Sequence, residues 1–166
     1  MHALSIDTFE FSRLKERREG ETAVAEFTRL SEEVAEPSGT VVWAVEGSTN
    51  ALGHPQLTLS VKVAVKLMCQ RCLTPFAYEI ESESVLALAK DDEAADELEA
   101  RLDDESIDVI VGSKNMNVLE LIEDEVLLEL PPSPKHPVCP DQVGQDTEAM
   151  VSAKRVSPFE VLKNKQ

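Results

Sequence analysis

Aromatic and basic residues are both scarce in this sequence, and each shortage limits what the protein can be. Aromatic side chains make up 4% of the 166 residues, although 42% are hydrophobic. The core must therefore be mainly aliphatic. Lysine and arginine number 16 against 32 acidic residues, which gives a formal net charge of −16. Because binding to a phosphate backbone depends on clustered lysine and arginine, this balance argues against direct RNA binding and favours basic protein partners.

Signal sequences, long apolar runs and paired cysteines are also missing. Residues 1–7 lack the basic region and apolar stretch of a secretory signal. The longest apolar runs, such as 41–45 and 85–89, are too short to span a bilayer. The three cysteines form no paired disulfide framework. We therefore expect a protein of the reducing cytoplasm.

The hydrophobic pattern predicts one α+β domain over residues 1–166 with an antiparallel sheet at its centre. Apolar residues alternate strictly over 57–67, which indicates a half-buried strand. The stretch 75–89 repeats this character, so the two are expected to pair as a long antiparallel hairpin around Cys69–Cys72. The segments 41–45 and 107–111 add further strands.

Helices are expected on both sides of this hairpin. Apolar residues at helical spacing predict helices within 7–19 and 24–34. Asn117 is placed to cap a third helix over 118–130, whose acidic residues are expected on its outer face. The predicted core joins the alternating strand to this helix through Leu59, Val61, Val63, Val65, Leu119, Ile122 and Val126.

Two segments have a different character. Residues 90–106 contain nine acidic residues against Lys90 and Arg101, which predicts a mobile acidic loop; the alternative is a docking surface for a basic protein. The tail, about 140–166, is weakly patterned and is expected to be loosely ordered. A final short helix is predicted where Ser157 and Pro158 begin it, with an apolar face containing Phe159 and Leu162.

One group of residues suggests a metal site. Cys69 and Cys72 have the Cys-x2-Cys spacing that lets two thiolates reach one ion from a tight turn. His136 and Cys139 supply two more ligands, and together they would complete a closed tetrahedral site for structural zinc. Two alternatives remain open: unmetallated residues in turns, and a dithiol redox pair at Cys69 and Cys72.

Motifs for other chemistry are absent. The sequence has no glycine-rich phosphate loop, no His-Glu-x2-His and no nucleophile elbow. His54 lies between Gly53 and Pro55, which is typical of a turn rather than of a general base. We therefore predict no catalytic residues.

Several motifs together resemble a known family. They are the alternating strand ending in Leu67-Met68-Cys69-Gln70-Arg71-Cys72 and followed by Pro75-Phe76, the pair Ile107-Asp108, the acids Glu123-Asp124-Glu125 in a helix closed by Leu130-Pro131, the pair His136 and Cys139, and the end Ser157-Pro158-Phe159-Glu160-Val161-Leu162. In this combination the chain resembles the YceD family of large ribosomal RNA subunit accumulation proteins.

The resemblance implies a non-enzymatic, cytoplasmic factor in the synthesis, processing or stability of 23S (large-subunit) rRNA. With the acidic charge, it leads us to expect ribosomal proteins or large-subunit assembly factors as partners, and only an indirect association with 23S rRNA. The candidate partner-binding residues are Glu123, Asp124, Glu125, Phe159 and Leu162. A direct RNA-binding module and a Cys-x2-Cys zinc or redox protein are the alternative functions.

Overall fold

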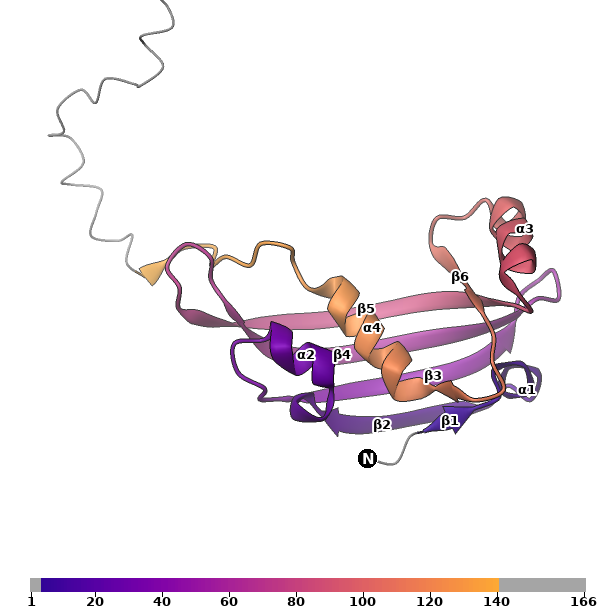
Figure 1. Cartoon of the computed structure of the whole chain (residues 1–166), viewed down its shortest axis with the longest axis horizontal. Helices are drawn as coiled ribbons and strands as arrows, with labels where there is room; N and C mark the ends of the chain where they lie inside the picture. The colour runs from indigo at the N-terminus through magenta and orange to yellow at the C-terminus, as the bar shows by residue number, and fades with distance from the viewer. Residues whose placement is uncertain (1–3, 141–166) are drawn as a thin grey trace, which may run out of the picture.

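The protein is built on a five-stranded sheet in the order β2-β3-β4-β5-β6 (Figure 1). The computed structural model describes residues 4–140. The elements in chain order are β1 (Ser5–Ile6), α1 (Thr8–Arg13), β2 (Arg17–Ala23), a 3-10 turn (Val24–Glu26), α2 (Thr28–Glu33), β3 (Thr40–Thr49), β4 (Pro55–Met68), β5 (Pro75–Ala89), α3 (Asp92–Leu102), β6 (Ile107–Val111), β7 (Met116–Asn117) and α4 (Val118–Glu129). The predicted α+β class is confirmed.

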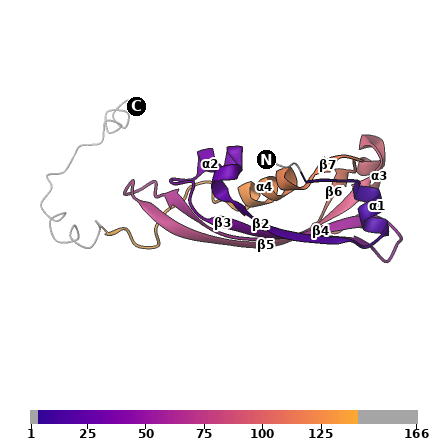
Figure 2. The same cartoon turned by 90° about the horizontal axis from the view of Figure 1, so that it is seen from below.

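The long hairpin is the centre of this sheet. β4 and β5 pair antiparallel over almost their whole length, with Val63 opposite Ile80. The alternation of β4 places one set of side chains in the core, where Leu59, Val61, Val63 and Val65 are each almost fully buried. Figure 2 shows that helices α1 to α4 all lie on this same side of the sheet.

Helix α4 covers the middle of the sheet. Its start is set by Asn117, whose side chain accepts a hydrogen bond from the backbone N–H of Leu119 at 3.1 Å. It ends before Pro131-Pro132, which have no N–H groups to continue it. Ile122 and Val126 are fully buried against the sheet, as the sequence predicts, whereas Leu119 is only partly buried.

Shortening Ile122 to alanine should therefore destabilise the protein substantially. The change Ile122→Ala removes most of a fully buried side chain and leaves a cavity, which typically costs ~2–5 kcal/mol. Leu128→Ala is the matched control, because Leu128 lies on the same helix but is 78% exposed. We expect it to change the free energy of unfolding by less than ~0.5 kcal/mol. Urea denaturation of both variants measures the difference, and equal losses would contradict the packing.

The N-terminal region differs from its prediction. The helix predicted within 7–19 ends at Arg13, because Lys15 adopts a left-handed backbone conformation with φ of 52°. The following residues form β2, the edge strand beside β3, in which Gly20 lies opposite Trp43. The indole ring covers this glycine so closely that a Cβ atom there would lie 2.8 Å from the ring. Tertiary packing thus selects a strand where the local pattern favoured a helix.

The acidic segment is also more regular than predicted. It forms helix α3 rather than a loop, capped by the Asp91 side chain, which accepts the Ala94 N–H at 2.8 Å. Leu98 anchors the helix in the core. This helix returns the chain along β5 to the level of Val85, so that β6 pairs with the end of β5 in parallel in an otherwise antiparallel sheet. Among residues 4–140, no helix has the length and apolar character needed to cross a bilayer.

Candidate functional site

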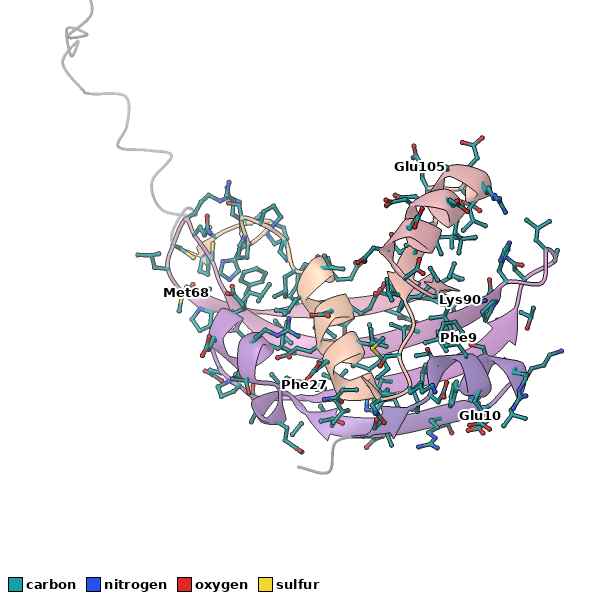
Figure 3. The ribbon with its side chains drawn as sticks, turned by 45° about the vertical axis from the view of Figure 1, so that its right-hand side comes forward. Phe9, Glu10, Phe27, Met68, Lys90 and Glu105 are labelled. Atoms are coloured by element: carbon teal, nitrogen blue, oxygen red, sulfur yellow. The ribbon has the colours of Figure 1, made fainter. Side chains whose placement is uncertain are left out.

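Four side chains with metal-binding atoms meet at one end of the molecule. Cys69 and Cys72 lie in the turn of the β4–β5 hairpin, and His136 and Cys139 follow α4. One ligand atom from each lies within 4.8 Å of all the others. Figure 3 shows the yellow sulfur atoms gathered at this end, where Met68 is labelled. The four residues predicted as metal ligands are therefore brought together.

The distances suit a tetrahedral ion. With Zn–S bonds of ~2.3 Å, two sulfurs of a tetrahedral site lie about 3.8 Å apart, and a sulfur and a nitrogen slightly closer. The Sγ atoms of Cys69 and Cys139 are 3.8 Å apart. The Sγ of Cys72 lies 3.3 Å from Nδ1 of His136. The cluster can bind a metal, and its three sulfurs and one imidazole are the donor set of structural zinc sites.

Hydrogen bonds and a ring contact hold the two halves of the cluster in place. The N–H of Gln70 donates to the carbonyl of Pro134 at 2.9 Å, and the guanidinium of Arg71 donates to the carbonyl of His136 at 2.6 Å. The ring of His136 also contacts the ring of Phe76 on β5, with centroids 4.7 Å apart. These contacts fix the segment after α4 onto the hairpin turn.

The two buried thiols of the cluster have very different pKa values. Burial raises the pKa of Cys69, but N–H donors from Cys72, His136 and Arg71 outweigh that effect and lower it to about 5. The pKa of Cys139 instead rises to about 11, because the thiol is buried and lies beside the other two sulfurs. One thiolate is therefore already favoured, and a bound cation would offset the repulsion that opposes a second one.

Two of the candidate partner-binding carboxylates are directed into the protein. Glu123 is 7% exposed, and Glu125 is 8% exposed. The carboxylate of Glu125 accepts hydrogen bonds from the hydroxyls of Ser82 and Ser84 on β5, at 2.7 and 2.8 Å. The sequence pattern placed these acids on the outer face of α4, whereas the structure uses them to attach that helix to its neighbours.

Glu123 performs a capping role that no sequence pattern revealed. Its Oε1 accepts the backbone N–H groups of Arg29 and Leu30 at 2.7 and 3.0 Å, and its Oε2 lies 2.9 Å from the Arg29 guanidinium. These N–H groups belong to the first turn of α2, where an N-cap side chain would normally accept them. The N-cap residue is Phe27, whose side chain has no hydrogen-bond acceptor. The Glu123 carboxylate, 94 positions after Arg29, takes its place.

The remaining candidates are placed differently. Asp124 is half-exposed and pairs with Arg29 at 2.6 Å, and its carboxylate is the largest contribution to raising the pKa of that guanidinium. Phe159 and Leu162 lie outside the described residues. Partner binding by this set stays a prediction, and Asp124 is its accessible member within 4–140.

Comparison with known proteins places the chain in a family. Residues 57–164 match the sequence model of the large ribosomal RNA subunit accumulation protein YceD. The match covers 108 of the 166 residues and includes the hairpin, helix α4 and all four cluster residues. No solved structure matches the chain. The protein therefore belongs to the YceD family, whose name connects it with accumulation of large-subunit ribosomal RNA.

Proposed function

We propose that this protein promotes accumulation of 23S rRNA without chemistry of its own, by binding ribosomal proteins or large-subunit assembly factors. The family match supports the link to 23S rRNA accumulation. The net charge of −16 supports action through protein partners, since such a protein is repelled by phosphate backbones and attracts basic proteins.

The distribution of charge gives this proposal a candidate contact surface. Helix α3 exposes acidic residues along its length, including Asp92, Glu93, Asp96 and Glu99. Figure 3 shows Glu105 at the end of this segment, projecting away from the sheet. Leu98 alone among the α3 side chains is buried, so charges on the exposed face can be reversed without disturbing the core.

Deletion of the gene should lower 23S rRNA more than 16S rRNA, and the wild-type protein should restore the ratio. A variant with Asp96→Lys and Glu99→Lys should restore it less well, because these changes weaken attraction to a basic partner. Glu32→Lys with Glu33→Lys is the matched control, since both residues are exposed on α2. Quantifying the two rRNAs in each strain is the measurement.

Affinity purification with and without nuclease separates protein contacts from RNA contacts. We expect ribosomal proteins or assembly factors to remain bound after nuclease treatment and to dissociate as salt rises. Two results would contradict the proposal: a normal rRNA ratio in the deletion strain, and tight binding of the purified protein to naked 23S rRNA at physiological salt.

We also propose that Cys69, Cys72, His136 and Cys139 hold a structural zinc ion. The match between their spacing and tetrahedral geometry supports this assignment. With all four positions of the ion occupied by protein ligands, no open position remains for a substrate, so the ion would serve stability rather than catalysis.

A further inference from the structure

The side of the sheet opposite the helices is open to solvent. Strand alternation places the following residues on this surface, here called the open face: Arg17, Glu19, Glu21, Val42, Ala44, Ser60, Lys62, Glu81 and Glu83. Figure 2 shows that none of the helices α1 to α4 lies against it. On this face Val42 of β3 is 47% exposed. A hollow of about 650 Å³ lies over this region.

The open face has a regular order of side chains across the strands. One row runs Glu21, Val42, Lys62, Glu81 from β2 to β5, and the next runs Glu19, Ala44, Ser60, Glu83. Both rows therefore have a carboxylate at each end. Between them lie Val42 and the cation Lys62 in the first row, and Ala44 and Ser60 in the second. Since neighbouring strands lie about 4.8 Å apart, the carboxylates on β2 and those on β5 are separated across the strands by roughly 14 Å.

Internal ion pairs neutralise only part of this charge. Lys62 pairs with Glu81 at 3.4 Å, and Arg17 pairs with Glu19 at 3.1 Å. Within residues 4–140, Glu21 and Glu83 form no ion pair. Glu83 accepts only the Ser60 hydroxyl, at 3.3 Å. Two exposed carboxylates thus remain without a cation, one on each side of the exposed Val42.

We propose that the open face binds a basic segment of a partner protein, one that presents an apolar side chain between flanking lysine or arginine residues. This inference rests on the proposed function, because it takes the partner to be a basic protein. The apolar side chain would cover Val42 and Ala44, and the flanking cations would pair with Glu21 and Glu83. A helix with its side chains is about 10–12 Å wide, so it fits between carboxylates roughly 14 Å apart.

The probe is a fluorescent synthetic peptide of lysine and leucine with helical periodicity, about 14 residues long and therefore roughly 20 Å as a helix. Anisotropy measures its binding to the full chain at physiological salt. Glu21→Gln with Glu83→Gln should weaken binding about 5- to 10-fold. Glu32→Gln with Glu33→Gln removes the same charge from α2, away from the open face, and should change binding less than about twofold. A lysine–serine peptide should bind more weakly than the lysine–leucine one.

Amide NMR of the full chain shows where on the protein the peptide binds. The peptide should shift the signals of Val42, Ala44 and Lys62 first. Equal weakening by the two pairs of substitutions would overturn the proposal, because attraction would then follow net charge alone. Shifts at these amides on adding a 23S rRNA fragment would also overturn it. So would shifts caused by Lys163→Glu with Lys165→Glu in the free protein, because the chain's own end would then occupy the face.

The outcome of the peptide-binding experiment can be distinguished from the outcome of the rRNA test of the proposed function. If the substituted protein binds the peptide normally while gene deletion still lowers 23S rRNA, the open-face inference fails and the proposed function stands. If the peptide binds as expected but the rRNA ratio in the deletion strain is normal, the proposed function fails.

Discussion

Protein purified without chelator should contain about one zinc ion per chain, and its removal should lower the melting temperature markedly. A ligand present at about 1,000 times its dissociation constant stabilises a fold by ~4 kcal/mol. For a domain of this size, that corresponds to a fall of roughly 10–15 °C. The ion would join the β4–β5 turn to the segment after α4, so its loss should loosen this end first. Elemental analysis and thermal denaturation with and without EDTA are the measurements.

Substituting the ligands tests the same site without a chelator. Cys69→Ser and His136→Ala should each reduce the zinc content and the melting temperature. His54→Ala is the matched control, since His54 lies in the β3–β4 turn, away from the cluster. Protein that carries almost no zinc as isolated, and whose melting temperature EDTA leaves unchanged, would contradict the assignment. The four residues would then simply form packed turns.

Glu123→Ala should cost more stability than any other single carboxylate replacement on α4. The change leaves the N–H groups of Arg29 and Leu30 without their acceptor and removes a largely buried partner of the Arg29 guanidinium. Losing one member of a buried pair costs ~3–5 kcal/mol; because Arg29 is half-exposed, we expect ~2–4 kcal/mol. Urea denaturation measures the loss.

Asp124→Ala provides the control for this prediction. Asp124 pairs with the same arginine but is half-exposed, so its removal should cost less than ~1 kcal/mol. Glu123→Gln should fall between the two, because the amide oxygen can still accept a backbone N–H. Hydrogen exchange at Arg29 and Leu30 should accelerate in Glu123→Ala and change little in Asp124→Ala. Equal losses of stability for Glu123→Ala and Asp124→Ala would show that capping of α2 contributes nothing.

The capping role of Glu123 also affects how partner binding is tested. Charge reversal at Glu123 or Glu125 would disturb the attachment of α4 to α2 or β5, so reduced binding in such variants would not identify a contact. Asp124 and the exposed face of α3 avoid this difficulty, because their carboxylates face solvent. The useful substitutions are therefore those whose side chains take no part in the core.

The sequence by itself determined the features that depend on local patterns. Strict alternation over 57–67 has a period of two, which defines a strand with one buried face and therefore predicts the long hairpin with β5. Asn117 sets the start of α4 through a local hydrogen bond, and Pro131 sets its end because it has no N–H group. The Cys-x2-Cys spacing indicated metal ligands, and the net charge of −16 favoured basic partners.

Only the tertiary structure decided which distant groups meet. The sequence nominated His136 and Cys139, but their placement within 4.8 Å of the hairpin cysteines depends on where the chain runs after α4. The hydrophobic periodicity of α4 also failed to predict that Glu123 and Glu125 are buried, because it assigns carboxylates to the solvent-facing side. In the structure, free N–H groups of α2 stabilise Glu123, and serine hydroxyls of β5 stabilise Glu125. The parallel β5–β6 pair likewise required α3 to return the chain along β5 to the level of Val85. Such contacts join residues tens of positions apart, and their energies depend on geometry that no local pattern contains.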